Sequence, residues 1–150
     1  TAAPAVDGCS IPTHAIPLRA LAHGFARLAT GNGLGTARAA AAKRLFAACM
    51  NHPEMVAGVN RFDSRIMAAG NGRILAKMGA QGVYCGALPD KGLGFAVKCH
   101  DGAVVPAEIA FGAAIAAFHG TVMQYQDRQP ILSAVGSMVG QIAPDRDYFK

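Results

Sequence analysis

The apolar positions recur at helical spacing in the first part of the chain and at strand spacing beyond residue 70. Within 18–28 they return every three or four residues behind Pro17, which is typical of an amphipathic helix with proline in its first turn. An Ala-rich run follows the glycines of 31–35 and indicates a second helix with Thr36 as its N-cap. We predict helices over 18–28, 36–50, 53–56 and 64–69.

Short β-rich runs follow these helices, over 73–76, 82–88 and 93–98. The last two are separated by Pro-Asp-Lys-Gly at 89–92, which are residue types typical of a tight turn between strands. The pattern therefore predicts three sequential antiparallel strands, and a further strand over 138–142.

A long apolar helix is predicted to begin at Pro106, after a turn at 101–102. We expect its small residues to face the sheet, because small side chains permit close approach of backbones. These residues are Ala110, Ala113, Ala117 and Gly120. Glu108 and His119 interrupt the apolar stretch 103–123, so we interpret it as a buried helix and not as a membrane span.

The order of elements, helices first and then strands, a helix and a strand, indicates an α+β fold in which an antiparallel sheet packs against helices. The 150 residues are enough for one domain with its own core. We expect a single segment over 1–150, mostly helical in 1–70, with the antiparallel sheet and the long helix in 71–150.

Composition excludes several classes of protein. An apolar fraction of 52% with 15% charged residues excludes a disordered chain. The net charge is +5, but the basic residues are scattered and only Lys43 and Arg44 are adjacent, so we expect neither a nucleic-acid nor a membrane partner. The four cysteines lie far apart without C-x-x-C spacing, which favours reduced thiols in a cytoplasmic protein.

Asp7-Gly8-Cys9, in a loop before the first helix, is a candidate metal or substrate motif. A thiolate binds zinc well, and a neighbouring carboxylate can orient a ligand or a substrate. One cysteine is not a metal site, however, and a buried structural cysteine is the alternative interpretation.

Lys77-Met78-Gly79 closes a predicted strand. A lysine at this position, beside glycines that let a substrate approach the backbone, is similar to the K-T-G element of serine acyl-transferases. A lysine whose pKa is lowered by burial or by another cation can act as a base. The alternative is a solvated lysine at a sheet edge.

Arg61-Phe62-Asp63 lies ahead of the strands. Arg61 could clamp a substrate carboxylate through two hydrogen bonds, or it could pair with Asp63 and tie the loop down, and both interpretations stay open. His52 and His100 each lie near a cysteine, but without a second pair at metal-binding spacing we interpret both as structural.

These motifs occur in one order along the chain. They are D-G-C-S-I-P-T-H-A-I-P-L-R from Asp7, F-A-R-L-A from Phe25, H-P-E-M-V-A-G from His52, R-F-D from Arg61, K-M-G-A-Q-G-V-Y from Lys77 and A-L-P-D-K-G-L-G-F-A-V-K from Ala87. Together they resemble the asparaginase family labelled asparaginase II, which shares the fold of the serine β-lactamases and penicillin-binding proteins. The resemblance covers nearly the whole chain and is weakest after Gln126.

The resemblance implies an amidohydrolase that converts L-asparagine to L-aspartate and ammonia by a Ser–Lys mechanism near a zinc ion. Cys9 matches a zinc ligand of the family, and Asp7 matches its companion, aimed at the substrate or at the ligands. Lys77 matches a catalytic lysine that pairs with a serine. Arg61 and Gly79 complete our set of candidate substrate-binding residues. Gln81 is a departure, because family members usually have Glu there.

Family members also carry an upstream Ser-x-x-Lys, a second serine and a C-S-G-K-H stretch, and none of these occurs in 1–150. We therefore expect this chain to be the C-terminal half of such an enzyme, inactive alone, with the missing N-terminal half as its partner and a homodimer left open. One rival is another serine acyl-transferase of the same fold. The other is a non-catalytic remnant whose exposed inner face binds a partner.

Overall fold

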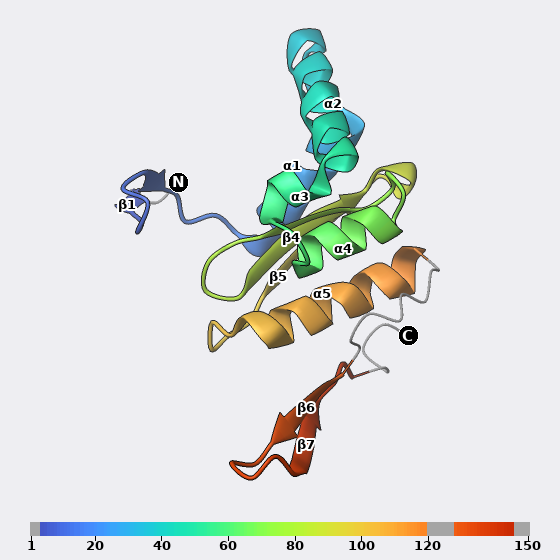
Figure 1. Cartoon of the computed structure of the whole chain (residues 1–150). Coiled ribbons are helices and arrows are strands. Elements are labelled where there is room, and N and C mark those ends of the chain that lie inside the picture. The colour runs from blue at the N-terminus through green and yellow to red at the C-terminus, as the bar shows by residue number, and fades with distance from the viewer. Residues whose placement is uncertain (1–3, 120–127, 146–150) are drawn as a thin grey trace.

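The computed structural model describes residues 4–119 and 128–145. Helices lie on both faces of a small sheet, and a two-stranded hairpin extends from each end of the chain (Figure 1). In chain order the elements are β1 (Ala5–Val6), β2 (Pro12–Thr13), α1 (Leu18–Thr30), α2 (Thr36–Asn51), α3 (Pro53–Ala57), α4 (Phe62–Ala69), β3 (Leu75–Met78), β4 (Val83–Leu88), η1 (Pro89–Lys91), β5 (Leu93–Lys98), α5 (Val104–His119), β6 (Gln129–Leu132) and β7 (Met138–Ile142).

The α+β class and the three sequential antiparallel strands are confirmed. The sheet has the order β3-β4-β5, with Lys77 opposite Cys85 and Val83 opposite Lys98. The predicted turn at 89–92 is a single 3-10 turn that ends at Gly92, whose φ of 62° lies in the left-handed region favoured by glycine.

The first strand of the sheet begins two residues later than predicted, at Leu75, and continues through Met78. The residues before it form a turn, in which Asn71 and Gly72 both have positive φ and the Arg73 amide donates to Gly70. A chain in this conformation cannot join a ladder, so the strand shifts along the sequence. Lys77 consequently lies inside the strand and not at its end.

The helix α1 packs on one face of the sheet and α5 on the other. Two glycines permit this close packing. A Cβ at Gly94 of β5 would collide with the Ala22 carbonyl oxygen of α1, and one at Gly86 of β4 would lie 2.5 Å from the Phe111 ring of α5. Both positions require glycine because the neighbouring backbone or ring already fills the space.

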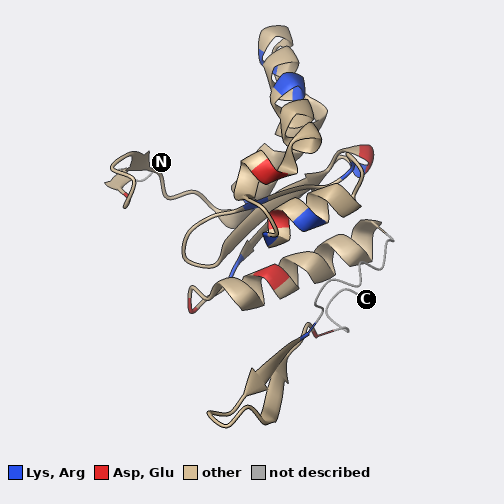
Figure 2. Cartoon of the chain, viewed as in Figure 1, with Lys and Arg blue, Asp and Glu red and all other residues tan. Residues whose placement is uncertain are grey.

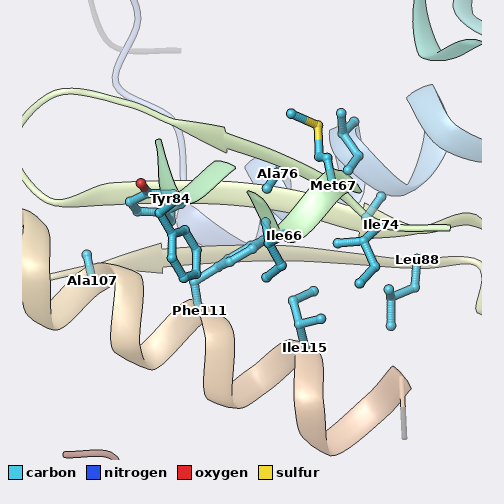
Figure 3. Packing of buried hydrophobic residues seen from close by; sticks show 12 residues of the cluster. Ile66, Met67, Ile74, Ala76, Tyr84, Leu88, Ala107, Phe111 and Ile115 are labelled. Atoms are coloured by element: carbon cyan, nitrogen blue, oxygen red, sulfur yellow. The ribbon is translucent and has the colours of Figure 1, made fainter. Parts of the chain in front are cut away.

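The core lies between the sheet, α4 and α5, and aromatic rings form its centre. Phe111 is fully buried, with its ring centroid 5.5 Å from that of Tyr84 and 6.4 Å from those of Phe62 and Phe95. Figure 3 shows Ala107, Phe111 and Ile115 pointing from α5 towards the sheet. Burying such rings contributes about 2–3 kcal/mol each relative to exposure.

The prediction that small residues of the long helix face the sheet was wrong. Ala110 and Ala113 are half-buried and Ala117 is exposed, whereas the large Phe111 and Ile115 are buried. The helix stands far enough from the sheet to hold an aromatic layer, so size alone did not identify its inner face. Its start lies at Val104, two residues before the predicted Pro106, and Gly120 lies outside the described residues.

The helices of the first part lie close to their predicted positions. The N-cap of α2 is Gly35 and not Thr36, which is the first helical residue, and α4 begins at Phe62, two residues before the predicted start. The strand predicted over 138–142 is confirmed as β7, although its partner β6 was not predicted.

Three further observations concern expectations from composition. Across the described ranges, no helix is both long and apolar enough to cross a membrane. All four cysteines, which lie within these ranges, are free thiols. Within the described ranges, Figure 2 shows the basic positions scattered over several elements.

Candidate functional site

The candidate site is built around the end of β3, which is an edge strand of the sheet. The Gly79 amide donates to the Val83 carbonyl oxygen at 2.8 Å, towards β4. Because backbone groups alternate in direction along a strand, the polar groups of Met78 point the other way, to the open edge. Unpaired groups at such an edge need partners from side chains or from water.

Side chains form hydrogen bonds with both of these backbone groups of Met78. The amide donates to Asp63 Oδ2 at 2.7 Å, and the carbonyl oxygen accepts a hydrogen bond from Lys77 Nζ at 2.7 Å. A carboxylate therefore holds the peptide group before the Met78 Cα, and the lysine side chain holds the peptide group after it. Charge-assisted hydrogen bonds of this length are about twice as strong as neutral ones.

Lys77 itself is exposed. Since it lies directly opposite Cys85, the two side chains leave the sheet on the same face, which is opposite to that of Met78 and Tyr84. The expectation of an amine at a sheet edge agrees with this position. The expectation of a buried amine does not agree with it, because a lysine on an edge strand reaches solvent through its long stem.

Asp63 is the buried charged group of the cluster, with 1% of its surface exposed. It lies in the first turn of α4, where a carboxylate also interacts favourably with the helix dipole. Its second oxygen, Oδ1, accepts a hydrogen bond from the Tyr84 hydroxyl at 2.8 Å. Neither of the two interpretations of the R-F-D motif included this role.

Tyr84 of β4 links the sheet to two helices, α4 and α5. Its hydroxyl oxygen lies 2.8 Å from Asp63 Oδ1 and 3.0 Å from Glu108 Oε1 of α5. Burial, together with the two carboxylates, raises the pKa of Tyr84 far above its ordinary value, so that it remains a hydrogen-bond donor. The acidic segments of α4 and α5 are seen on these neighbouring helices in Figure 2.

Arg61 and Gly79 lie next to Met78. Arg61 immediately precedes α4, is exposed, and has a guanidinium nitrogen 3.7 Å from the Met78 sulfur. Gly79 follows the strand, and a Cβ there would lie 3.2 Å from the Val83 side chain. Arg61 thus contacts the Met78 side chain, on the face of the sheet opposite to the one from which the Lys77 side chain leaves, whereas Lys77 contacts the Met78 carbonyl oxygen.

The turn after Gly79 carries the residue that departs from the family pattern. Gln81 has a φ of 57°, and its carbonyl oxygen accepts a hydrogen bond from Lys98 Nζ at 2.7 Å. The next residue, Gly82, leaves no room for a Cβ beside the backbone of Gly102 and Ala103. The backbone of this turn is therefore fixed by the loop after β5.

Asp7 and Cys9 lie apart from this cluster, in the loop of the β1–β2 hairpin that extends from the body of the protein (Figure 1). Asp7 Oδ1 accepts the Cys9 amide at 2.8 Å, and Oδ2 accepts the Thr13 hydroxyl at 3.0 Å. These bonds, the Cys9 amide first, lower the pKa of Asp7. The Asp7 carboxylate shapes the turn that presents the exposed Cys9 thiol.

The described residues do not form a zinc site by themselves. No three His, Cys, Asp or Glu side chains within 4–119 and 128–145 are grouped so that they could hold a metal ion. Cys9 can supply one ligand, whereas structural zinc sites use four protein ligands and catalytic sites three.

Tyr84 and Glu108 are members of the cluster that the sequence analysis did not identify. Glu108 gave a usable signal, because it is the only Asp, Glu, Lys or Arg within α5. Tyr84 gave none beyond its place in a strand. Their meeting with Asp63 depends on how α4 and α5 pack, which no local pattern encodes.

Comparison with known proteins agrees with the motifs. The sequence profile of a family described as L-asparaginase II matches residues 1–144. Among curated proteins, none matches the chain.

Proposed function

Because the chain belongs to the L-asparaginase II family, we propose that it forms the Lys77-bearing part of an amidohydrolase site that acts on L-asparagine. The observation that carries the proposal is the cluster at the end of β3. There an exposed ammonium, an exposed guanidinium and a glycine lie around Met78. We propose that this sheet and α5 belong to a serine β-lactamase-like fold in a cytoplasmic enzyme.

In the proposed reaction, a serine hydroxyl attacks the side-chain amide of L-asparagine and passes its proton to Lys77, which acts as the general base. Lys77 returns this proton to the leaving nitrogen as the C–N bond breaks, so that ammonia leaves, and water then hydrolyses the acyl-enzyme ester to L-aspartate and the free serine. A cation such as Arg61 suits the α-carboxylate of the substrate, because a guanidinium binds a carboxylate through two parallel hydrogen bonds. Gly79 permits a substrate to approach the backbone.

We propose that the serine comes from outside residues 1–150, in a segment that packs against this chain, so that 1–150 alone has no activity. In support, no serine hydroxyl of the described residues is bonded to Lys77. Ser64 is the serine nearest in sequence, and its hydroxyl is already bonded to the carbonyl oxygens of Pro53 and Gly58.

Zinc enters the proposal only as an ion that Cys9 and ligands from the same outside segment would hold. A bound zinc ion would supply Lewis-acid chemistry there. The serine attack, the proton transfer and the hydrolysis of the acyl-enzyme use only the residues of this chain, the serine and water.

A groove beside β5 favours the second candidate function, a non-catalytic chain that binds a partner. The groove has a volume of about 630 Å³ and lies between β5, α5, the start of α1 and residues 142–145. Most of its lining is apolar, with Phe95, Ile109 and Phe118 among the larger side chains. Such a groove is typical of a surface that another segment covers.

The test is Lys77→Met in the intact protein, with ammonia release from L-asparagine as the readout. Methionine keeps most of the stem and removes the proton acceptor, so the rate should fall about a hundredfold or more, as expected for a lost general base. Lys91→Met is the matched control, because Lys91 is an exposed lysine in the turn between β4 and β5. A normal rate for Lys77→Met, or no activity in the unmodified intact protein, would contradict the proposal.

A further inference from the structure

The backbone of Met78 is held by two side chains at an edge where a strand is ordinarily loose. Its amide is bonded to Asp63 and its carbonyl oxygen to Lys77. The two side chains approach from different elements, since Asp63 belongs to α4 and Lys77 to the strand itself. The amide belongs to the peptide group before the Met78 Cα and the carbonyl oxygen to the one after it. A bond that holds the amide therefore restrains the neighbouring carbonyl oxygen, to which Lys77 Nζ donates.

Asp63 is suited to fix the backbone at Met78 because it is itself immobilised. It is buried, both of its oxygens are engaged, and Tyr84 holds Oδ1 from β4, the adjacent strand. Phe62 and Tyr84 also pack edge to face, with ring centroids 5.6 Å apart. A buried carboxylate with partners on two strands thus ties the start of α4 to the open edge of β3.

We propose that Asp63 is a positioning residue for Lys77: by holding the Met78 amide, it presents the Met78 carbonyl oxygen at a fixed place, where it orients the lysine amine. This inference rests on the proposed function, in which Lys77 takes the proton of the attacking serine. It adds a residue outside the reacting atoms on which the geometry of that transfer depends.

The expected consequence is a loss of rate without a matching loss of substrate affinity. Proton transfer is efficient only when the base lies within hydrogen-bond reach, and a misplacement of about 1 Å can lower the rate about a hundredfold. Asp63→Ala removes the acceptor of the Met78 amide. We expect kcat to fall about tenfold or more while KM changes less than about threefold.

Two variants separate positioning from general loosening. Tyr84→Phe weakens the same buried cluster but leaves Asp63 Oδ2 and its bond to Met78 in place. Asp63→Asn keeps a carbonyl oxygen for the Met78 amide, while its NH₂ group can donate to the Tyr84 oxygen and the Tyr84 hydroxyl to Glu108. We expect both variants to keep kcat within about threefold of the unmodified protein, although Tyr84→Phe should lower the melting temperature.

Hydrogen exchange tests the bond between the Met78 amide and Asp63 directly, without a substitution and without an activity assay. Amide hydrogen exchange in the unmodified protein should show the Met78 amide protected to a degree similar to that of Gly79, whose amide is bonded inside the sheet. Exchange of Met78 at the rate of a free edge amide would overturn the inference. This measurement also applies if Asp63→Ala fails to fold.

The rates of these variants distinguish the proposed function from the positioning role of Asp63. A normal rate for Lys77→Met contradicts the proposed function. A large loss for Lys77→Met with a normal kcat for folded Asp63→Ala overturns only the positioning role of Asp63. The positioning role is also overturned if Tyr84→Phe loses kcat as severely as Asp63→Ala, because the effect would then follow loosening of the cluster. Protection of Met78 with a selective loss in Asp63→Ala supports both.

Discussion

Gly94 of β5 lies against the backbone of Ala22 in α1, with no space between them for a side chain. A Cβ at Gly94 would collide with the Ala22 carbonyl oxygen and would stand 2.7 Å from the Ala26 amide nitrogen. The contact sets how closely α1 approaches the sheet, and the face of the sheet that carries Lys77 depends on this helix layer.

Gly94→Ala should therefore destabilise the protein strongly, by about 3 kcal/mol, the upper range for overpacking a well-filled site. Backbone atoms are the obstacle, and they cannot move without displacing the helix. Gly24→Ala is the control, because Gly24 lies in α1 with nothing within 4 Å of its Cβ position. That change should stabilise the protein by about 0.5–1 kcal/mol through helix propensity. Denaturant unfolding measures both, and equal values for the two variants would contradict the packing of α1 on β5.

The same contact illustrates what the sequence could and could not predict. The hairpin turn at 89–92 and the strands beside it follow from local residue types, so β4 and β5 were placed to within one residue. Gly94 gave no sign of its role, because the residue that needs the space lies about seventy positions earlier in the chain. Likewise, β6 begins with Gln129-Pro130, residues that local propensity does not assign to a strand.

The residues of the candidate site also fall into two groups, those that a local motif identifies and those that only packing brings together. Lys77 and Gly79 became candidates because a short motif carries them, and Arg61 because it belongs to another. The bond from Asp63 to the Met78 amide joins residues fifteen positions apart in different elements, and Glu108 reaches Tyr84 across twenty-four. Contacts of this kind are set by packing of α4 and α5 on the sheet, and sequence periodicity contains no information on them.

Tyr84 should resist ionisation well beyond the ordinary range of tyrosines. Its pKa is raised by burial and by the neighbouring carboxylates, so the folded state binds the phenolic proton more tightly than the unfolded state does. This group therefore leaves stability unchanged below about pH 10 and lowers it as the pH rises above that value. Monitoring tyrosinate absorbance during alkaline titration should show a tyrosine signal, that of Tyr84, which appears only with unfolding.

Tyr84→Phe supplies the comparison for this titration. At neutral pH it should cost about 1–3 kcal/mol, because Asp63 Oδ1 loses its donor inside the protein. The delayed tyrosine signal should vanish, and alkaline destabilisation should begin at higher pH than in the unmodified protein. A variant that retains the delayed signal would assign it to another tyrosine.

The cysteines should react with an alkylating reagent in a defined order. Cys9 is exposed, whereas Cys85 is buried and burial raises its pKa to about 11. Since the thiolate is the reactive form, Cys9 should be labelled first and Cys85 last at mildly alkaline pH. Cys99 should react more slowly than Cys9, because its hydrogen bond to Asp101 raises its pKa. Mass spectrometry of time points gives the order, and early labelling of Cys85 in the folded protein would contradict the burial of β4.

The last prediction concerns Cys9 and zinc in the intact protein. The Asp7 carboxylate fixes the turn around Cys9 and leaves the thiol exposed at the end of the β1–β2 hairpin, where a ligand from another segment can join it. Cys9→Ser should lower zinc occupancy about tenfold or more, because the hydroxyl of serine is a much poorer ligand than a thiolate. Its melting temperature without metal should not change, since Cys9 packs against no core residue.

Cys49→Ser is the matched control for metal content, because Cys49 is a free thiol of α2 that packs against the core. It should retain zinc while losing some stability, the reverse of the pattern expected for Cys9→Ser. Asp7→Asn tests the turn separately. Asparagine keeps one oxygen to accept a bond but loses the negative charge of the carboxylate, so zinc occupancy should fall less than in Cys9→Ser. Elemental analysis of the three variants decides the matter, and full zinc content in Cys9→Ser would remove Cys9 from the ligand set.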